Sequence, residues 1–374
     1  MAEYLTNTAD LTAVANAIRE KGGTSEQLAC PDGFVAAIQA IQTGAPLQIA
    51  VTTNAGATVT ATKDSKTVSG TADTSGNCTL TVDEAGTWTV TVATASTTKT
   101  SDVVVGISNV DLPLVDSVLN NNSWETIKKV SDAGQGENYW SIGDRKAVTL
   151  NGTVGHLSLS NYTTYAFIIG FNHNASVEGA NRIHFQLAKT ALSGGTDVCL
   201  CDRSYNSTVS ATGYFSMNSS RTNSGGWKSS QMRTNICGTS LSSYSGTIIA
   251  VIPAALRAVL KSVTKYTDNT GNSSDASAVT ATTDYFFLLS EYEVFGTIFR
   301  GNPNESNKQE QYSYYSAGNS KIKYKHDGTS TAAVWWLRSP RENSSANFVR
   351  VLSDGAAANY PADYSIGFAP GFCV

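Results

Sequence analysis

The order of apolar and polar positions changes along the chain, and each change predicts a different kind of element. Between residues 46 and 108, apolar residues alternate with threonine and other polar residues in LQIAVTT, ATVTATK, CTLTVDEAGTWTVTVAT and SDVVVGI. A period of two residues is typical of strands that bury one face. Turn-forming residues separate these stretches, so residues 46–108 predict a small β-sandwich of the immunoglobulin type, with Trp88 in its core.

Helical spacing is found on both sides of this region. In residues 1–44, apolar side chains such as Leu11 and Ile18 recur on one face, which predicts a helical N-terminal module of two short helices. In residues 110–139, Ser123 is placed to cap a short helix that ends at a glycine. We expect this helix to be a connector to the rest of the chain.

Residues 140–374 form the largest predicted unit, an α+β domain. KAVTLNG, TYAFIIGF, RIHFQLA and GTIIAVI are expected to be strands. PAALRAVLKSVTKYT, which begins at Pro253, is expected to be a helix because its apolar residues share one helical face. Serine, glycine and asparagine are frequent around residues 204–230 and 269–278, which predicts loops. Long loops in a compact domain are usually functional or mobile.

Composition narrows the class of protein. Hydrophobic residues make up 41% of the chain and charged residues only 15%, whereas about 25% charged residues is usual. The net charge of −4 gives no reason to expect a nucleic acid or an anionic membrane as partner. We expect neither a signal peptide nor a membrane span, because the start of the chain is not basic and then apolar, and no apolar stretch approaches about 18 residues.

Cysteine, histidine and carboxylate spacing indicates no catalytic or metal centre. The 6 cysteines are scattered, and Cys199 and Cys201 form the only close pair. The histidines show no ligand spacing, so we expect buried free thiols, no metal and no cofactor. Glu291 and Glu293 could share a face, as the two carboxylates of a glycosidase must. A structural role is the expected one, and we expect the protein not to be an enzyme.

Three stretches resemble a family of C-type-lectin-like domains found at the ends of phage and prophage tail proteins. They are YWSIGDRKAVTLNG (139–152), DYFFLLSEYEVFG (284–296), and VWWLRSP with FAPGFCV (334–374). The start of the chain, LTAVANAIREKGGTSEQLACPDGFVAAIQAI, is similar to a segment common in phage structural proteins of Gram-positive hosts. The resemblance implies a C-type-lectin-like fold for residues 140–374 and a role as a receptor-binding or distal tail component of a virion or prophage-encoded particle.

Some members of this family are variable proteins of diversity-generating retroelements. In these, an error-prone reverse transcriptase rewrites adenines of a template, and the copy replaces the C-terminal coding repeat. A randomised AAY codon becomes NNY, which cannot encode Glu, Lys, Gln, Met or Trp. From Arg341 to Val374 the last four are absent, and Glu342 is the only glutamate. The resemblance therefore implies a variable ligand-binding surface in residues 341–366, hereafter the variable segment.

Candidate residues divide into a binding surface and a scaffold. The candidate ligand-binding residues are Arg341, Asn343, Ser344, Ser345, Asn347, Val349, Arg350, Leu352, Ala358, Asn359, Tyr360, Asp363, Tyr364 and Ile366. The candidate scaffold residues are Trp335, Trp336, Arg338, Phe348 and Phe372. Tyrosine, arginine, serine and asparagine are typical of protein binding surfaces. Arg338 is expected to meet a carboxylate, with Asp354 as the candidate, and Asp354-Gly355 predicts a hairpin turn.

The expected partners follow from this reading. The ligand is expected to be a host-surface protein or glycan, bound by several copies of the chain in a homo-oligomer, with a trimer favoured. The N-terminal module is expected to contact other tail proteins. The calcium-dependent sugar motif of this fold class is absent, and Asn302-Pro303-Asn304 is the nearest sequence to it. Two alternatives remain: a structural tail or baseplate component, and an adhesin of fixed specificity.

Overall fold

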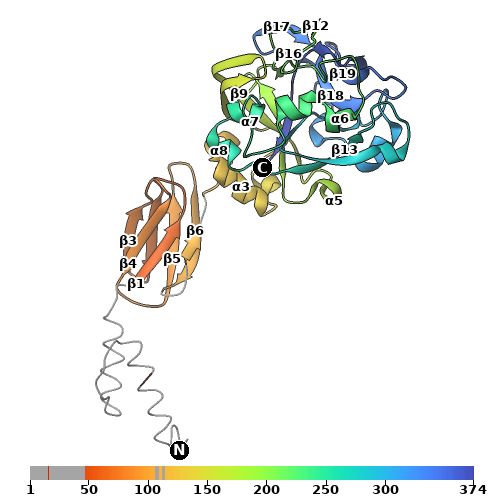
Figure 1. Ribbon diagram of the computed structural model, residues 1–374. Helices are drawn as coiled ribbons and strands as arrows, with labels where there is room; N and C mark the ends of the chain where they lie inside the picture. Colours follow the sequence, from red (N-terminus) through yellow and green to blue (C-terminus); the bar gives the residue numbers. More distant parts are fainter. Residues whose placement is uncertain (1–15, 17–46, 106–108, 112–113) are drawn as a thin grey trace, which may run out of the picture. The chain divides into compact units, whose positions relative to one another are not determined.

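The computed structural model describes residues 16, 47–105, 109–111 and 114–374 (Figure 1). Contacts divide the chain into two compact units, Met1–Leu114 and Val115–Val374. The predicted helical module at residues 1–44 lies, apart from Asn16, outside the described residues. The part of the expected connector that follows Leu114 belongs to the second unit.

The first unit is built from two sheets around one core, one of them antiparallel throughout. Its strands are β1 (Leu47–Thr52), β2 (Thr58–Lys63), β3 (Lys66–Thr71), β4 (Asn77–Val82), β5 (Thr87–Ala93), β6 (Thr98–Val104) and β7 (Asn109–Asp111). One sheet has the order β4-β1-β7 and the other β3-β2-β5-β6, and within the first sheet β7 runs parallel to β1. Apolar residues of both sheets, among them Ile49, Leu80 and Val90, surround the fully buried Trp88. Alternate residues face this core, as the period of two requires.

The second unit contains short helices and many strands. Its helices are α3 (Trp124–Asp132), α4 (Gly136–Tyr139), α5 (Ala175–Glu178), α6 (Gly226–Ser229), α7 (Ile248–Val251), α8 (Ala254–Arg257), α9 (Glu291–Phe295) and α10 (Ser313–Ser316), with the helical turns η1 (Leu119–Asn121), η2 (Met232–Cys237), η3 (Ala276–Ala278) and η4 (Pro303–Lys308). Its strands are β8 (Arg145–Val154), β9 (Leu157–Phe171), β10 (Ile183–Lys189), β11 (Val198–Cys199), β12 (Ser207–Thr208), β13 (Val263–Asp268), β14 (Val279–Asp284), β15 (Phe286–Phe287), β16 (Lys323–Lys325), β17 (Gly328–Ala333), β18 (Trp335–Pro340), β19 (Asn347–Val351), β20 (Ala357–Pro361), β21 (Tyr364–Ser365) and β22 (Gly371–Cys373).

A five-stranded sheet of order β15-β22-β10-β9-β8 forms the centre of the second unit. The strand β22, close to residue 374, pairs with both β15 and β10. Phe372 of β22 packs against the rings of Phe185 and Phe286, with ring centroids 5.3 and 5.2 Å apart. The rings of Trp124 in α3 and Phe185 pack edge to face, with their centroids 5.6 Å apart. Segments from both ends of the unit therefore share one core.

The helix α3 forms where its capping signal predicts it. The Ser123 side chain accepts a hydrogen bond from the backbone N–H of Thr126 at 3.0 Å, which satisfies a free donor of the first turn. Trp124 and Ile127 are buried on one face. Gly134, with φ +68°, follows the helix and adopts a left-handed conformation that favours glycine.

The predicted fold class is wrong. Strands make up 38% of the described residues and helices 18%, so this part of the chain is mostly β-sheet, rather than α+β with a separate helical module. GTIIAVI, expected to be a strand, contains the helix α7. PAALRAVLKSVTKYT, expected to be one helix, contains only the four-residue α8 before β13 begins at Val263. Pairing of β13 with β14 overrides the helical spacing there.

Candidate functional site

The scaffold beneath the variable segment is completely buried. Trp335, Trp336, Arg338, Phe348 and Phe372 have no exposed surface. The indole N–H of Trp336 donates to the carbonyl of Phe215 at 3.0 Å, and that of Trp335 donates to the carbonyl of Lys321 at 3.0 Å. A buried indole requires such a partner, so both tryptophans are fixed in orientation.

The variable segment is folded as a hairpin on this scaffold. The strands β18, β19 and β20 form one antiparallel sheet, in which Phe348 lies opposite Tyr360 and Arg350 lies opposite Ala358. The turn between β19 and β20 contains the predicted Asp354-Gly355 pair: Gly355 has φ +88°, and the Asp354 carboxylate accepts the backbone N–H of Ala356 at 3.0 Å. The turn chemistry thus fixes the register of the segment.

The candidate binding residues divide into three groups by burial. Asn343 and Ser345 are exposed, and the half-buried group is Arg341, Ser344, Asn347, Arg350, Leu352, Ala358, Asn359, Tyr360, Asp363 and Tyr364. Val349 and Ile366 have no exposed surface and belong to the core, so their assignment to the binding surface is wrong. The codon argument cannot separate them, because it depends on residue type and not on which strand face a side chain occupies.

Three of the candidates form a contiguous aromatic and cationic cluster. The guanidinium of Arg350 lies over the ring of Tyr360, with the central carbon 3.7 Å from the ring centroid. The ring of Tyr364 is tilted against Tyr360 at 4.3 Å between centroids. The Nε atom of Arg350 is buried and has no hydrogen-bond partner. Burial lowers the pKa of the Arg350 guanidinium, because the charged form is partly removed from water.

A second segment, which the sequence-based site did not include, lies beside the variable segment. We call residues 202–223 the adjacent loop. Its Asn223 is buried, and the side-chain amide donates to the carbonyls of Ser344 at 2.6 Å and Asn347 at 2.9 Å. Its Arg221 pairs with Asp363 at 3.3 Å. The serine-, asparagine- and glycine-rich composition around 204–230 was the available signal, but composition alone does not show which surface a loop borders.

Tyr205 of the adjacent loop extends the cluster. Its hydroxyl accepts the backbone N–H of Val334 at 2.9 Å, which holds the ring next to β18. Lys325 of β16 lies over this ring at 5.3 Å from the centroid. The positive charge of Arg350 acts to lower the pKa of Tyr205, but burial dominates and raises this pKa to about 12, so the hydroxyl is neutral. Tyr205, Lys325, Arg350, Tyr360 and Tyr364 are hereafter the Arg350 cluster.

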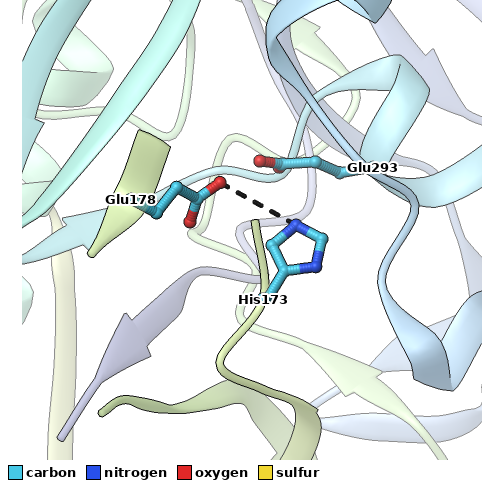
Figure 2. A group of neighbouring side chains, drawn as sticks. All are labelled: His173, Glu178 and Glu293. Atoms are coloured by element: carbon cyan, nitrogen blue, oxygen red, sulfur yellow. Dashed lines mark ion pairs between the residues drawn. The ribbon is translucent and has the colours of Figure 1, made fainter. Parts of the chain in front are cut away.

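A group of ionisable residues is buried around Arg338 of the scaffold. Figure 2 shows His173, Glu178 and Glu293 turned toward one another, with His173 Nε2 3.8 Å from a Glu178 oxygen. Lys265 donates to Glu178 at 2.6 Å and to Glu293 at 2.9 Å. Arg338 binds both oxygens of Glu293, one of them at 2.9 Å. The expected partner of Arg338, Asp354, is therefore wrong: Asp354 is exposed in the hairpin turn.

This buried network does not fit a metal ion. The ligand atoms of His173, Glu178 and Glu293 lie within 4.8 Å of one another, as a divalent cation would require. Lys265 and Arg338, however, already bring two positive charges onto the same two carboxylates. A metal would have to displace them or bind against their repulsion. The network is a set of paired buried charges, which are retained because each is compensated.

The environment shifts the pKa values of this network in opposite directions. Burial alone would raise the pKa of Glu293, but Arg338 and Lys265 lower it far below its ordinary value. Burial raises the pKa of Glu178 to about 7 despite the opposing charge of Lys265. Burial also lowers the pKa of His173 to about 3, so the imidazole is neutral near pH 7. Glu293 is thus the fixed anion of the network.

The other groups considered for chemistry are also buried. Glu291 and Glu293 have no exposed surface, and Glu293 caps α9 through the backbone N–H of Ser290 at 2.9 Å. Cys199 and Cys201 lie with their sulfur atoms 3.9 Å apart and are free thiols, each no more than 2% exposed. Because Glu291 and Glu293 are both fully buried, a polymeric substrate could not reach them, and their role is structural.

A model of a protein family, described as a domain of unknown function (DUF6273), matches residues 200–374. The match covers the adjacent loop, the scaffold and the variable segment, and leaves out β8, β9 and β10 of the central sheet. No curated protein matches the chain. In the described part of the chain, no helix is long and apolar enough to cross a membrane.

Proposed function

We propose that this chain is a ligand-binding protein that acts by recognition and not by catalysis, with the variable segment and the adjacent loop as its binding surface. The observation that carries the proposal is the Arg350 cluster: tyrosine and arginine side chains, half-buried, held above a scaffold with no exposed surface. Rigid aromatic residues on a fixed support bind with a small loss of conformational entropy.

The surrounding residues support recognition of a surface and not of a small molecule. Small-molecule sites are concave and enclosed. Two of the cavities in the described residues can be placed: one of about 310 Å³ is lined by residues near Val118 and Leu192, and another lies in the first unit near Trp88. Neither is lined by residues of the variable segment. The serines and asparagines around the Arg350 cluster provide adaptable hydrogen bonds to a partner.

The resemblance of the two ends of the chain to phage proteins supports a location. We propose that the protein is a tail component of a phage or prophage-encoded particle, that its ligand is on the host surface, and that several copies act together. Multiple copies would raise avidity by roughly 10²–10⁴ over a single site if the spacing allows simultaneous binding.

The proposal is tested by sequencing the gene and its flanking DNA in many isolates. We expect adenine-directed changes at codons for half-buried or exposed positions, including 350, 360 and 364. Codons 349 and 366 should retain apolar residues, because their side chains lie in the core. The codons for WWLRSP and PGFC should not vary.

Two results would contradict parts of the proposal. An invariant segment with no nearby template repeat would leave a fixed-specificity adhesin or a structural tail component. Changes spread equally over codons for buried and exposed residues would argue against a binding surface, since selection for binding concentrates on accessible side chains.

A further inference from the structure

Arg350 is a half-buried cation that pairs with no carboxylate in the described part of the chain. None of the ion pairs among the described residues involves its guanidinium, although Arg221, Arg233 and Arg338 each have a carboxylate partner. Its Nε atom is buried and makes no hydrogen bond. Tyr360 is the main partner of the guanidinium, through its ring and its hydroxyl. No carboxylate of the described residues compensates the charge, so an anion from outside could pair with it.

The neighbours of Arg350 prepare it for an anion. The central guanidinium carbon lies 3.7 Å from the centroid of the Tyr360 ring, and this cation–π contact holds the charge in place. Since Nε is buried, the two Nη atoms are the donors left for a ligand. Lys325 lies over Tyr205 on the same cluster, so a second positive charge is near. Lys325 does have a carboxylate close by, but the distance to the half-exposed Asp327 is 3.7 Å and that pair is weak. The net charge of the Arg350 cluster is positive, although the chain as a whole is negative.

We propose that the Arg350 cluster receives the carboxylate of an aspartate or glutamate side chain from a protein partner, with Arg350 as its bidentate ion partner and Tyr205 and Tyr360 beside it. This inference rests on the proposed function and specifies the chemistry of the ligand. A protein partner is favoured over a sugar because Arg350 and Tyr360 lie on paired strands of the sheet β18-β19-β20, and no residue of the cluster lines either of the two cavities described above. Planar, bidentate recognition is what arginine supplies to carboxylates.

The test uses the full chain and a display library of random linear peptides. Peptides selected on the native chain should share one Asp or Glu position. A selected peptide and its Glu→Gln version are then measured against the native chain and Arg350→Gln. The Glu→Gln change should weaken binding to the native chain at least about tenfold and should have little effect with Arg350→Gln, because each change removes the same ion pair.

Matched variants separate charge from shape. Arg350→Lys keeps the charge but loses the planar fork, so it should retain only part of the affinity. Arg257→Gln is the control, since Arg257 lies over Tyr244 at 4.5 Å outside the binding surface and should leave peptide binding unchanged. Arg257 also donates to the carbonyls of Ile249 and Ile252, so this variant should lower stability without affecting binding. Unfolding midpoints of all variants show whether a loss of binding reflects a loss of folding.

Each other result counts against the inference. Selected peptides without an acidic position, or equal effects of Glu→Gln on both proteins, would overturn it while leaving the proposed function intact, provided that Tyr360→Ser still abolishes binding. Binding that is unchanged in both Arg350→Gln and Tyr360→Ser would contradict the proposed function as well. So would the combination of a screen that selects no peptide and a glycan array that shows no binding. Arg350-dependent binding to carboxylated or phosphorylated glycans alone would replace the protein partner with an anionic glycan.

Discussion

At the scale of single residues, some charged side chains are paired inside the core, and others lie at the surface where a ligand could bind. Arg338 and Arg350 lie on neighbouring strands, β18 and β19. Arg338 is fully buried and bound to both oxygens of Glu293, whereas Arg350 is half-buried and bound to no carboxylate of the described residues. The same residue type therefore has a structural role in one strand and a proposed recognition role in the next.

Removing the buried guanidinium should be strongly destabilising. Arg338→Met leaves Glu293 with Lys265 as its remaining cation, and breaking a buried pair by removing one partner costs about 3–5 kcal/mol in the free energy of unfolding. Urea unfolding of the native and variant chains measures this loss. Arg341→Met, at a half-buried position three residues on, is the matched control and should change stability by less than about 0.5 kcal/mol. A loss of under about 1 kcal/mol for Arg338→Met would show that the network is dispensable.

Glu305 gives stability a specific pH dependence. Burial raises the pKa of this carboxyl from 4.5 to about 7. Since the folded state then holds the proton more tightly than the unfolded state, Glu305 contributes stability at low pH that is lost as the pH rises between these values, by up to about 1.4 kcal/mol per pH unit. Glu305→Gln, which mimics the neutral acid, should remove the part of the decline that Glu305 contributes and leave the part from Glu178, while the exposed Glu137→Gln should retain the full decline. Parallel urea-unfolding profiles for the native chain and Glu305→Gln across that range would contradict the assignment.

At the scale of elements, local signals were reliable where a specific chemical group closes the element. Ser123 and Gly134 mark the ends of α3, and Asp354-Gly355 marks the turn after β19. Apolar spacing alone was unreliable. Val263 shares a helical face with Leu256, Val259 and Leu260 but begins β13, because β14 offers a complete ladder of six paired residues.

The cap of α3 provides a quantitative check at this scale. Ser123→Ala removes the acceptor for the Thr126 N–H and should lower the free energy of unfolding by about 1 kcal/mol. The control is Ser193→Ala, at an exposed loop position, which should have an effect within about 0.5 kcal/mol. Thermal or urea unfolding of both variants decides the matter. Equal effects would mean that the cap does not contribute to stability.

The sequence predicted the scaffold of the candidate site better than its surface. Tryptophans and phenylalanines of the closing motifs are buried, as large aromatic residues usually are. Val349 and Ile366 were misplaced because neither codon usage nor residue type shows which side of a strand faces the core. The contribution of Tyr205 could not be predicted, because the adjacent loop meets the variable segment only through long-range contacts, such as the hydrogen bonds of Asn223, the ion pair of Arg221 with Asp363 and the pairing of β12 with β21.

At the scale of the whole molecule, the two units have separate cores that share no residue. Each unit has enough residues to fold independently, since domains usually need about 50 residues or more. Calorimetry of the full chain should therefore show two unfolding transitions. A shortened chain of residues 115–374 should keep one of them at an unchanged midpoint. A single transition, or a shortened chain that does not fold, would mean that the units depend on each other.

The position of β22 determines how a shift of the reading frame within the variable segment would affect the fold. This strand lies inside the central sheet, but it is encoded after the variable segment. A base change within the segment alters one side chain and leaves β22 intact. An insertion or deletion that shifts the reading frame replaces β22, and with it the ring of Phe372 between Phe185 and Phe286. Chains made from such reading frames would lack the strand between β15 and β10, expose an unpaired sheet edge and be open to proteolysis.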